Sequence, residues 1–195
     1  MKSASHFWFG ASAFKRRAEE IIREELSVAP ELVPVFKALM QARRDILARI
    51  AALDGRIRAT AKQHATVRLL MTAPGVGPIT VMAVVAAFDD AARFRRSSSA
   101  GAYLGLTPKR YESGEVSRNG RVSKRGDRFT RKCLYEAANA IYCRKLGGSR
   151  LRNWAKAVAE RTGPRKAKVA LARKVAVTLH AMWRSGTPFQ EAAMA

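Results

Sequence analysis

The sequence is poor in three features that define common protein classes: cysteine pairs, acidic residues and long apolar runs. Its two cysteines, Cys133 and Cys143, have no nearby histidine pair, which fits neither a zinc site nor a disulfide framework. The longest apolar stretch, residues 79–88, is far too short to cross a bilayer, and residues 1–10 lack a signal-peptide pattern. We therefore expect a cytoplasmic protein with reduced thiols, no metal site of its own and no membrane partner.

The shortage of acidic residues leaves a large positive charge. The chain has 37 Lys and Arg against 15 Asp and Glu, a net charge of +22. Residues 1–70 carry 13 basic and 7 acidic groups, residues 71–90 carry two aspartates only, and residues 91–195 carry 24 basic and 6 acidic groups. Because such a charge repels itself in a compact body, it indicates a polyanionic partner. DNA is the partner that we expect.

Apolar residues recur at alternating steps of four and three between Leu32 and Val67. This spacing predicts a long helix with a coiled-coil seam, in which Arg43, Thr60 and His64 are the weak positions. The seam can pair with a second chain or pack against its own body, and the sequence leaves both open. Gly55 interrupts the pattern and makes a bend or a turn near it plausible.

An apolar helix end, a Gly-x-Gly turn and a second apolar helix follow at residues 69–88, which resembles a helix-hairpin-helix. In such a motif the turn residues Gly75, Val76 and Gly77 offer bare backbone N–H groups at a helix start, where they bind phosphate without reading sequence. A turn that serves packing alone is the commoner explanation of a lone Gly-x-Gly. The high charge of the chain favours phosphate contact.

The rest of the chain predicts further helices. We expect a short helix with a serine cap from Ser97, a polar loop over residues 107–126, and a helix with the stripe Phe129, Cys133, Ala137 and Ile141. Two more helices are expected at about 151–161 and 165–183. The predicted fold class is mostly α: a helical, coiled-coil arm over residues 1–68, a helical DNA-binding domain over 69–187 with the hairpin motif at 69–88, and a tail at 188–195.

Basic residues gather in the polar loop and at the start of the helix after it, where they could grip the backbone of a duplex. These predicted DNA contacts are Arg110, Arg118, Arg121, Lys124, Arg125, Arg128, Arg131 and Lys132.

Five short motifs occur in a recognisable order: Ala-Pro-Gly-Val-Gly-Pro at 73–78, Phe-Asp-Asp at 88–90, Gly-Ala-Tyr-Leu-Gly-Leu-Thr-Pro at 101–108, Ser-Gly at 113–114 and Val-Ser-Lys-Arg-Gly-Asp at 122–127. In this order they resemble the C-terminal domain of insertion-sequence transposases related to the Piv invertase, a group that includes the RNA-guided bridge recombinases. The resemblance implies DNA transposition and site-specific recombination, with a structured guide RNA as a further partner.

Members of that family join a domain with four metal-binding Asp and Glu residues to a C-terminal serine that attacks the DNA backbone. By this resemblance Ser113 matches the nucleophile, and Ser123 is the second candidate. A serine hydroxyl needs a base, a metal or nearby cations for such chemistry. We expect the carboxylate domain to be absent from this chain. The chain would then hold no cofactor, would need divalent metal only together with that domain, and would be inactive alone.

Partners and alternatives follow from these interpretations. The helix at 32–67 is expected to join two copies of the chain, or to join the chain to a full-length transposase. The alternative function is a non-enzymatic DNA-binding module that regulates such a transposase. A base-excision glycosylase built on the same hairpin is a third possibility. By resemblance to that enzyme family, it would need an aspartate about twenty residues after Gly77, yet residues 95–101 contain none, and Asp89 and Asp90 come too early.

Overall fold

A computed structural model describes residues 11–21, 23, 30–113, 116–144 and 149–191. The chain divides into two compact units, residues 1–53 and 54–195, and each is described by itself. The secondary structure is mostly helical, as expected from the sequence. The described residues also form one small sheet of two strands, which the sequence did not predict. In the described part of the chain, every helix is too short or too polar to span a lipid bilayer.

The first unit contains α1 (Ala11–Glu20), the 3-10 helix η2 (Pro30–Leu32) and most of α2 (Val33–Gln63). Pro34 stands in the first turn of α2, where its missing N–H removes no helix hydrogen bond. Helix α1 contributes Phe14, whose ring lies 4.2 Å below the guanidinium of Arg43 on α2. Apolar side chains at seven-residue spacing remain exposed along η2 and α2, namely Leu32, Leu39, Ile46 and Leu53.

Helix α2 continues through Gly55 to Gln63 without interruption, so no helix–helix turn occurs at Gly55, one of the two possibilities that the sequence suggested. The helix ends instead at His64, whose extended backbone (φ −90°, ψ 114°) separates it from α3 (Ala65–Leu70). One helical glycine costs only about 1 kcal/mol, which the other residues of a long helix can offset.

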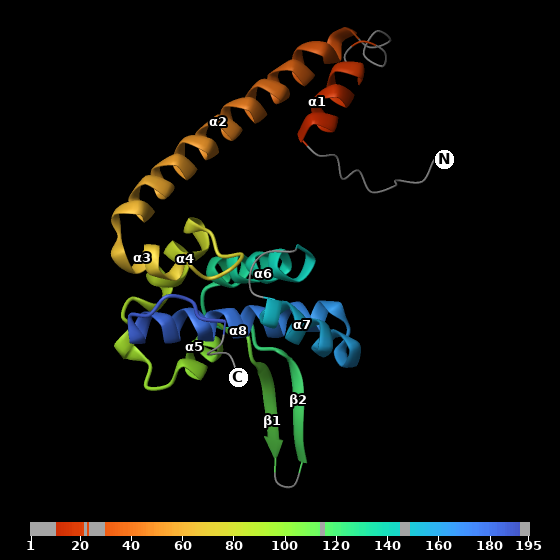
Figure 1. The fold of residues 1–195 in the computed structure, drawn as a ribbon. Helices are drawn as coiled ribbons and strands as arrows, with labels where there is room; N and C mark the ends of the chain where they lie inside the picture. The colour runs from red at the N-terminus through yellow and green to blue at the C-terminus, as the bar shows by residue number, and fades with distance from the viewer. Residues whose placement is uncertain (1–10, 22, 24–29, 114–115, 145–148, 192–195) are drawn as a thin grey trace. The chain divides into compact units, whose positions relative to one another are not determined.

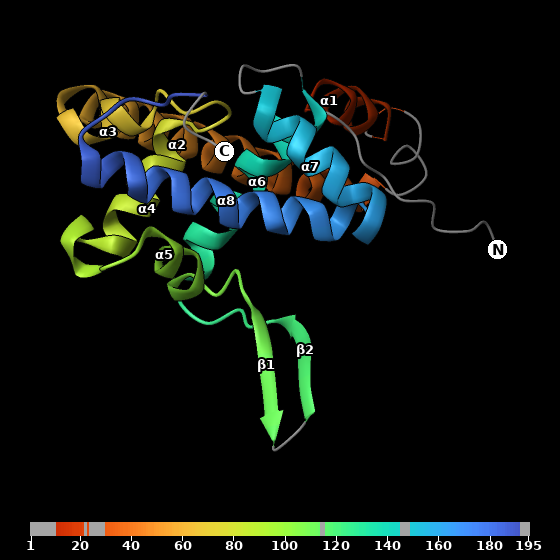
Figure 2. The ribbon, with the colours of Figure 1, turned by 60° about the horizontal axis from the view of Figure 1, so that its bottom comes forward.

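Helix α8 (Pro164–Ser185) forms the centre of the second unit (Figures 1 and 2). It packs against α3, α5 (Ser97–Tyr103), α6 (Arg128–Cys143) and α7 (Ser149–Thr162). Helix α4 (Pro78–Phe88) packs against α3 and α6. The helices expected near 151–161 and 165–183 are therefore confirmed as α7 and α8. The buried residues of α8 are mostly small or branched apolar residues, among them Leu171, Ala172, Val175, Ala176 and Leu179.

His180 of α8 is fully buried in this core. Its Nδ1 lies 3.0 Å from Ser97 Oγ and its Nε2 lies 2.9 Å from the carbonyl oxygen of Ala91, in the 3-10 helix η3 (Ala91–Arg93). The rings of Phe88 and Phe94 meet the imidazole edge to face. The Ser97 hydroxyl is therefore hydrogen-bonded to His180 of α8. The serine cap that we expected for α5 was wrong, because the N-cap residue is Arg96 and no side chain caps the helix.

Most of the polar segment 107–126 forms a β-hairpin, where the sequence had predicted a loop. Strand β1 (Pro108–Ser113) pairs antiparallel with β2 (Val116–Val122), and a register shift lies between Pro108 and Arg110. The hairpin extends away from the helices of its own unit (Figures 1 and 2). The ring of Tyr111 on β1 lies over Gly120 on β2, where an added Cβ would lie 2.6 Å from it.

The apolar stripe of α6 differs by one position from the predicted one. Ala137 and Ile141 are buried as expected, but Phe129 is 58% exposed and Thr130 takes its place in the interior. Thr130 can be buried because its hydroxyl donates to the carbonyl oxygen of Ala83 at 3.0 Å.

Candidate nucleic-acid interface

Two glycines fix the base of the hairpin. Gly105 (φ +66°) and Gly126 (φ +80°) both have left-handed backbones. A Cβ on Gly105 would lie 2.1 Å from the carbonyl oxygen of Arg125, and a Cβ on Gly126 would lie 2.2 Å from that of Tyr103. The segment that follows β2 therefore crosses the end of α5 in direct backbone contact. This crossing sets where the hairpin leaves the helical body.

Arg131 holds the same crossing from the side of α6. Its guanidinium donates to the carbonyl oxygens of Leu104 at 3.1 Å, Arg125 at 2.9 Å and Gly126 at 3.2 Å. These bonds satisfy carbonyl groups that no strand or helix pairs. Arg131, predicted as a DNA contact, thus has a structural role, because its Nη1 donates to backbone carbonyls.

A cleft of about 820 Å³ lies beside the hairpin base. Four cationic side chains line it, from β1, from the crossing segment and from α8: Lys109, Arg110, Arg125 and Arg173. Its other lining residues are Ala102, Thr107, Pro108, Tyr111 and Ser123, and none is acidic. Four cations with no carboxylate in the lining give the cleft a strong positive potential, which suits an anionic ligand such as a phosphate backbone.

Arg173 is positioned by the small residue beneath it. A Cβ on Gly101 of α5 would lie 2.7 Å from Arg173 Cγ, so the glycine leaves room for the stem of the arginine to cross α5. Arg173 also lines a second groove, which shares Pro108 with the cleft. This role of Arg173 was not predicted from the sequence, although the run of small residues at 98–102 was a signal for close packing there.

The two candidate serines lie in different surroundings. Ser113 is exposed at the far end of β1, where it pairs with Val116 of β2. Ser123 is half-buried and lines the basic cleft, and its N–H donates to the carbonyl oxygen of Thr107 at 2.9 Å. The structure therefore brings Ser123 together with the cations of the cleft, and it leaves Ser113 accessible at the end of the hairpin farthest from them.

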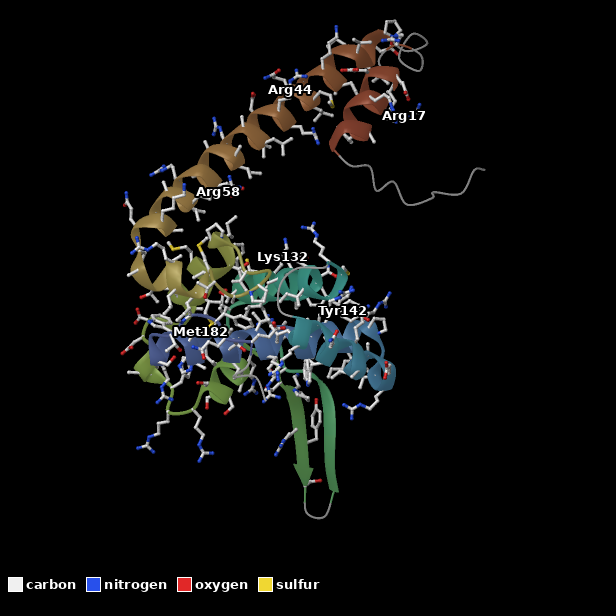
Figure 3. The ribbon with its side chains drawn as sticks, in the orientation of Figure 1. Arg17, Arg44, Arg58, Lys132, Tyr142 and Met182 are labelled. Carbon is white, nitrogen blue, oxygen red and sulfur yellow. The ribbon has the colours of Figure 1, made fainter. Side chains whose placement is uncertain are left out.

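The other predicted basic contacts are spread over the hairpin and α6. Arg121, Lys124, Arg128 and Lys132 are exposed, and Lys132 can be seen on α6 in Figure 3. Lys124 has a left-handed backbone (φ 57°) in the turn that precedes the Gly126 crossing. Arg118 belongs to β2, but its side chain lies outside the described residues. Lys109 was absent from the prediction, although it directly precedes Arg110.

The Gly-x-Gly turn joins α3 to α4 as expected, and its two glycines differ. Gly75 (φ +71°) faces α6, where an added Cβ would lie 2.7 Å from Ile141 Cγ1. Val76 is buried, and its N–H donates to the carbonyl oxygen of Ala73 at 3.3 Å. Gly77 is the N-cap of α4, and nothing lies within 4 Å of a Cβ built on it. Only Gly77 thus leaves open space at the start of α4.

Titratable groups near the interface have structural partners. Asp127 caps α6 by accepting from the backbone N–H of Thr130, and hydrogen bonds from Thr130 lower the pKa of this carboxyl. Burial raises the pKa of the Cys133 thiol, which therefore stays protonated at neutral pH. In the described ranges, no group of three or more His, Cys, Asp or Glu side chains could hold a metal ion. The described residues thus offer no fit for the divalent metal that the resemblance implies.

Comparison with known proteins gives one family and several relatives. Residues 67–160, which include α4, the hairpin and α6, match the family described as Transposase IS116/IS110/IS902 family. A probable family 20 transposase of Pseudomonas aeruginosa is 33% identical over 184 residues, which cover 89% of this chain and 54% of that protein.

Two further relatives are transposases of named insertion sequences. The transposase for element IS1111A of Coxiella burnetii is 31% identical over 177 residues, covering 88% of this chain and 49% of that protein. The transposase for element IS1328 of Yersinia enterocolitica is 28% identical over 184 residues, covering 93% and 54%. The chain spans about half the length of the curated relatives it matches. Its homologues are insertion-sequence transposases.

Proposed function

We propose that the chain is the DNA-binding, serine-bearing part of an insertion-sequence transposase. The observation that carries the proposal is the acid-free cleft at the hairpin base, with Lys109, Arg110, Arg125 and Arg173 around it. Lys109, Arg110 and Arg125 lie within residues 67–160, the segment that matches the transposase family, and Arg173 of α8 lines the same cleft. Backbone phosphates are the ligands, because cations on flexible stems contact phosphates without reading base sequence.

The duplex would lie along the hairpin and across α8, so that both strands of the hairpin present charge to it. Arg121 at the end of β2 and Lys109 at the start of β1 stand near the same end of the hairpin. Gly77 at the start of α4 adds a backbone contact of the kind that helix N-termini make with phosphate. Gly75 and Val76 support this turn through packing.

Ser113 is the nucleophile of the proposed reaction, in keeping with its match to the family motif. Its Oγ would attack a backbone phosphorus, lose its proton, and form a phosphoserine ester as a sugar hydroxyl leaves with a proton. The exposed end of β1 supports this role, since a phosphodiester in a duplex must be reached from outside. Ser123 supports the alternative, because it already lies among cations that would stabilise the transition state.

An affinity measurement tests the DNA-binding part of the proposal. Fluorescence anisotropy with a labelled duplex should show weaker binding by the triple variant Lys109→Gln, Arg125→Gln and Arg173→Gln. The matched control, Arg49→Gln, Arg56→Gln and Lys62→Gln, removes the same charge from exposed positions of α2. Equal losses in the two triples would mean that total charge, and not the cleft, binds DNA.

A denaturing gel tests the serine. Labelled duplex, magnesium and the part of a curated relative that this chain does not match would be supplied in trans. A protein–DNA adduct that Ser113→Ala abolishes and Ser123→Ala retains supports the assignment. An adduct that survives Ser113→Ala and disappears in Ser123→Ala would assign the chemistry to the cleft serine.

A further inference from the structure

A second groove, of about 770 Å³, also lies at the hairpin base and shares Pro108 and Arg173 with the basic cleft. The end of β2 forms one wall through Gly120, Arg121 and Val122, and α8 forms the opposite wall. Trp154 of α7 also lines the groove. All of these residues belong to the second unit, and the volume is in the range of pockets that hold small organic ligands.

The interior of this groove is apolar although the protein is strongly charged. Its uncharged lining includes Leu106, Pro108, Val122, Val169, Ala170 and Val177. Trp154 keeps 36% of its surface exposed, and the ammonium of Lys174 lies 4.9 Å from the centre of its ring. A duplex backbone needs no apolar contact, so the phosphate-binding function proposed above does not account for this surface.

The charged residues that line the groove are all cationic. They are Arg121, Arg165, Lys166, Arg173 and Lys174, and no acidic residue lines the groove. None of these five is in an ion pair within the described part of the chain. A lining that combines apolar side chains with cations is complementary to a ligand that joins a flat apolar body to an anion. A nucleotide with its base unpaired has this form, since the base offers π faces and the phosphates carry the charge.

We propose that this groove binds an unpaired nucleotide of DNA, with the base against Trp154 and the apolar residues of α8 and the flanking phosphates on the lining cations. The proposal rests on the DNA-binding function and adds a preference for DNA that has an unpaired or single-stranded segment. Arg173, which lines both the cleft and the groove, would hold the backbone where the strand passes from paired to unpaired.

Competition binding with the full chain tests this preference. The probes are a blunt duplex and a probe of the same total length in which the last five nucleotides of one strand are left unpaired as an overhang, compared at constant salt. We expect the overhang to bind about tenfold more tightly, in keeping with the contribution of base stacking on an aromatic ring. Trp154→Leu should remove this preference and leave blunt-duplex affinity within about twofold, because a leucine keeps the groove apolar but offers no flat face.

Phe129→Leu is the matched control, because Phe129 is an exposed aromatic on α6 that does not line the groove. It should keep the full preference, and circular dichroism would verify that both variants fold. Replacing the overhang bases by abasic sites should abolish the preference in the wild type.

The outcomes separate the two proposals. Equal affinity for the two probes, or a preference that Trp154→Leu leaves intact, would overturn the nucleotide groove while the duplex-binding function stands. A groove that serves an apolar protein segment would give this same result. Failure to bind either probe would overturn the DNA-binding function itself.

Discussion

At the scale of single residues, Gly105 has the most restrictive environment at the interface. Its φ of +66° is unfavourable for other residues, and a Cβ would stand 2.1 Å from a backbone oxygen that cannot move alone. We expect Gly105→Ala to lower the free energy of unfolding by about 2–5 kcal/mol, from left-handed strain and overpacking together. Urea unfolding measures this.

Gly77→Ala is the control for that substitution, because Gly77 has a negative φ and open space around its Cβ position. It should cost under about 1 kcal/mol, the scale of an N-cap change. Similar losses at the two glycines would show that the close crossing at Gly105 does not exist in solution.

His180 gives the molecule a pH dependence whose sign can be worked out. Burial lowers the pKa of its imidazole below the ordinary 6.5, and the charge of Arg184 acts in the same direction. The unfolded chain therefore binds more protons than the folded chain below pH 6.5, so stability is retained above that pH and falls as the pH drops through the lowered pKa. Urea unfolding at several values from pH 7.5 to pH 5 should show this decline.

His180→Gln should flatten the decline, because glutamine does not titrate and retains a donor and an acceptor for Ala91 and Ser97. His64 is exposed and supplies the control as His64→Gln, which should leave the slope as in the wild type. An unchanged slope in His180→Gln would assign the acid sensitivity to carboxylates instead.

At the scale of elements, the exposed seam of α2 predicts association. Leu39, Ile46 and Leu53 are 65%, 57% and 54% exposed at seven-residue spacing, an arrangement that a partner helix would bury. Sedimentation of Ile46→Lys with Leu53→Lys should show a smaller assembly than the wild type. Ala48→Lys with Ala51→Lys adds the same charge at exposed positions off the seam. If the mass of the seam variant is unchanged and the fold is retained, the seam is not an interface.

The elements also show what sequence could predict. Helical spacing and the Gly-Pro boundary at residues 163–164 were sufficient for α7 and α8, because both signals are local. The hairpin was missed because its strands are polar and include Gly120, so no apolar alternation marks them. The ring of Tyr111 on the neighbouring strand covers that glycine, and such a contact cannot be predicted from either segment alone.

The candidate site shows the same limit. The sequence predicted the basic segment, and the family resemblance predicted the two serines. Charge alone could not distinguish Arg125, which lines the cleft, from Arg131, which donates to backbone carbonyls. Arg173 comes to the site from a helix far along the chain. Its contribution depends on the packing of α8 over Gly101, which is a tertiary property.

At the scale of the whole molecule, the net charge of +22 means that counterion release should dominate DNA affinity. Contacts of this kind need no divalent metal. We expect EDTA to leave duplex affinity unchanged at constant ionic strength, as measured by anisotropy. A large loss on chelation would show that a bound metal takes part in DNA binding.

The slope of log K against log salt is the measurement that tests the central claim most directly, because it reports how many phosphates the chain neutralises. Wild-type protein should show a steep negative slope with duplex DNA. The variant with Lys109→Gln, Arg125→Gln and Arg173→Gln should have a slope shallower by about 2.7, since each phosphate contact contributes about 0.9. A slope equal to that of the wild type, or an affinity independent of salt, would contradict a phosphate-binding cleft at the hairpin base.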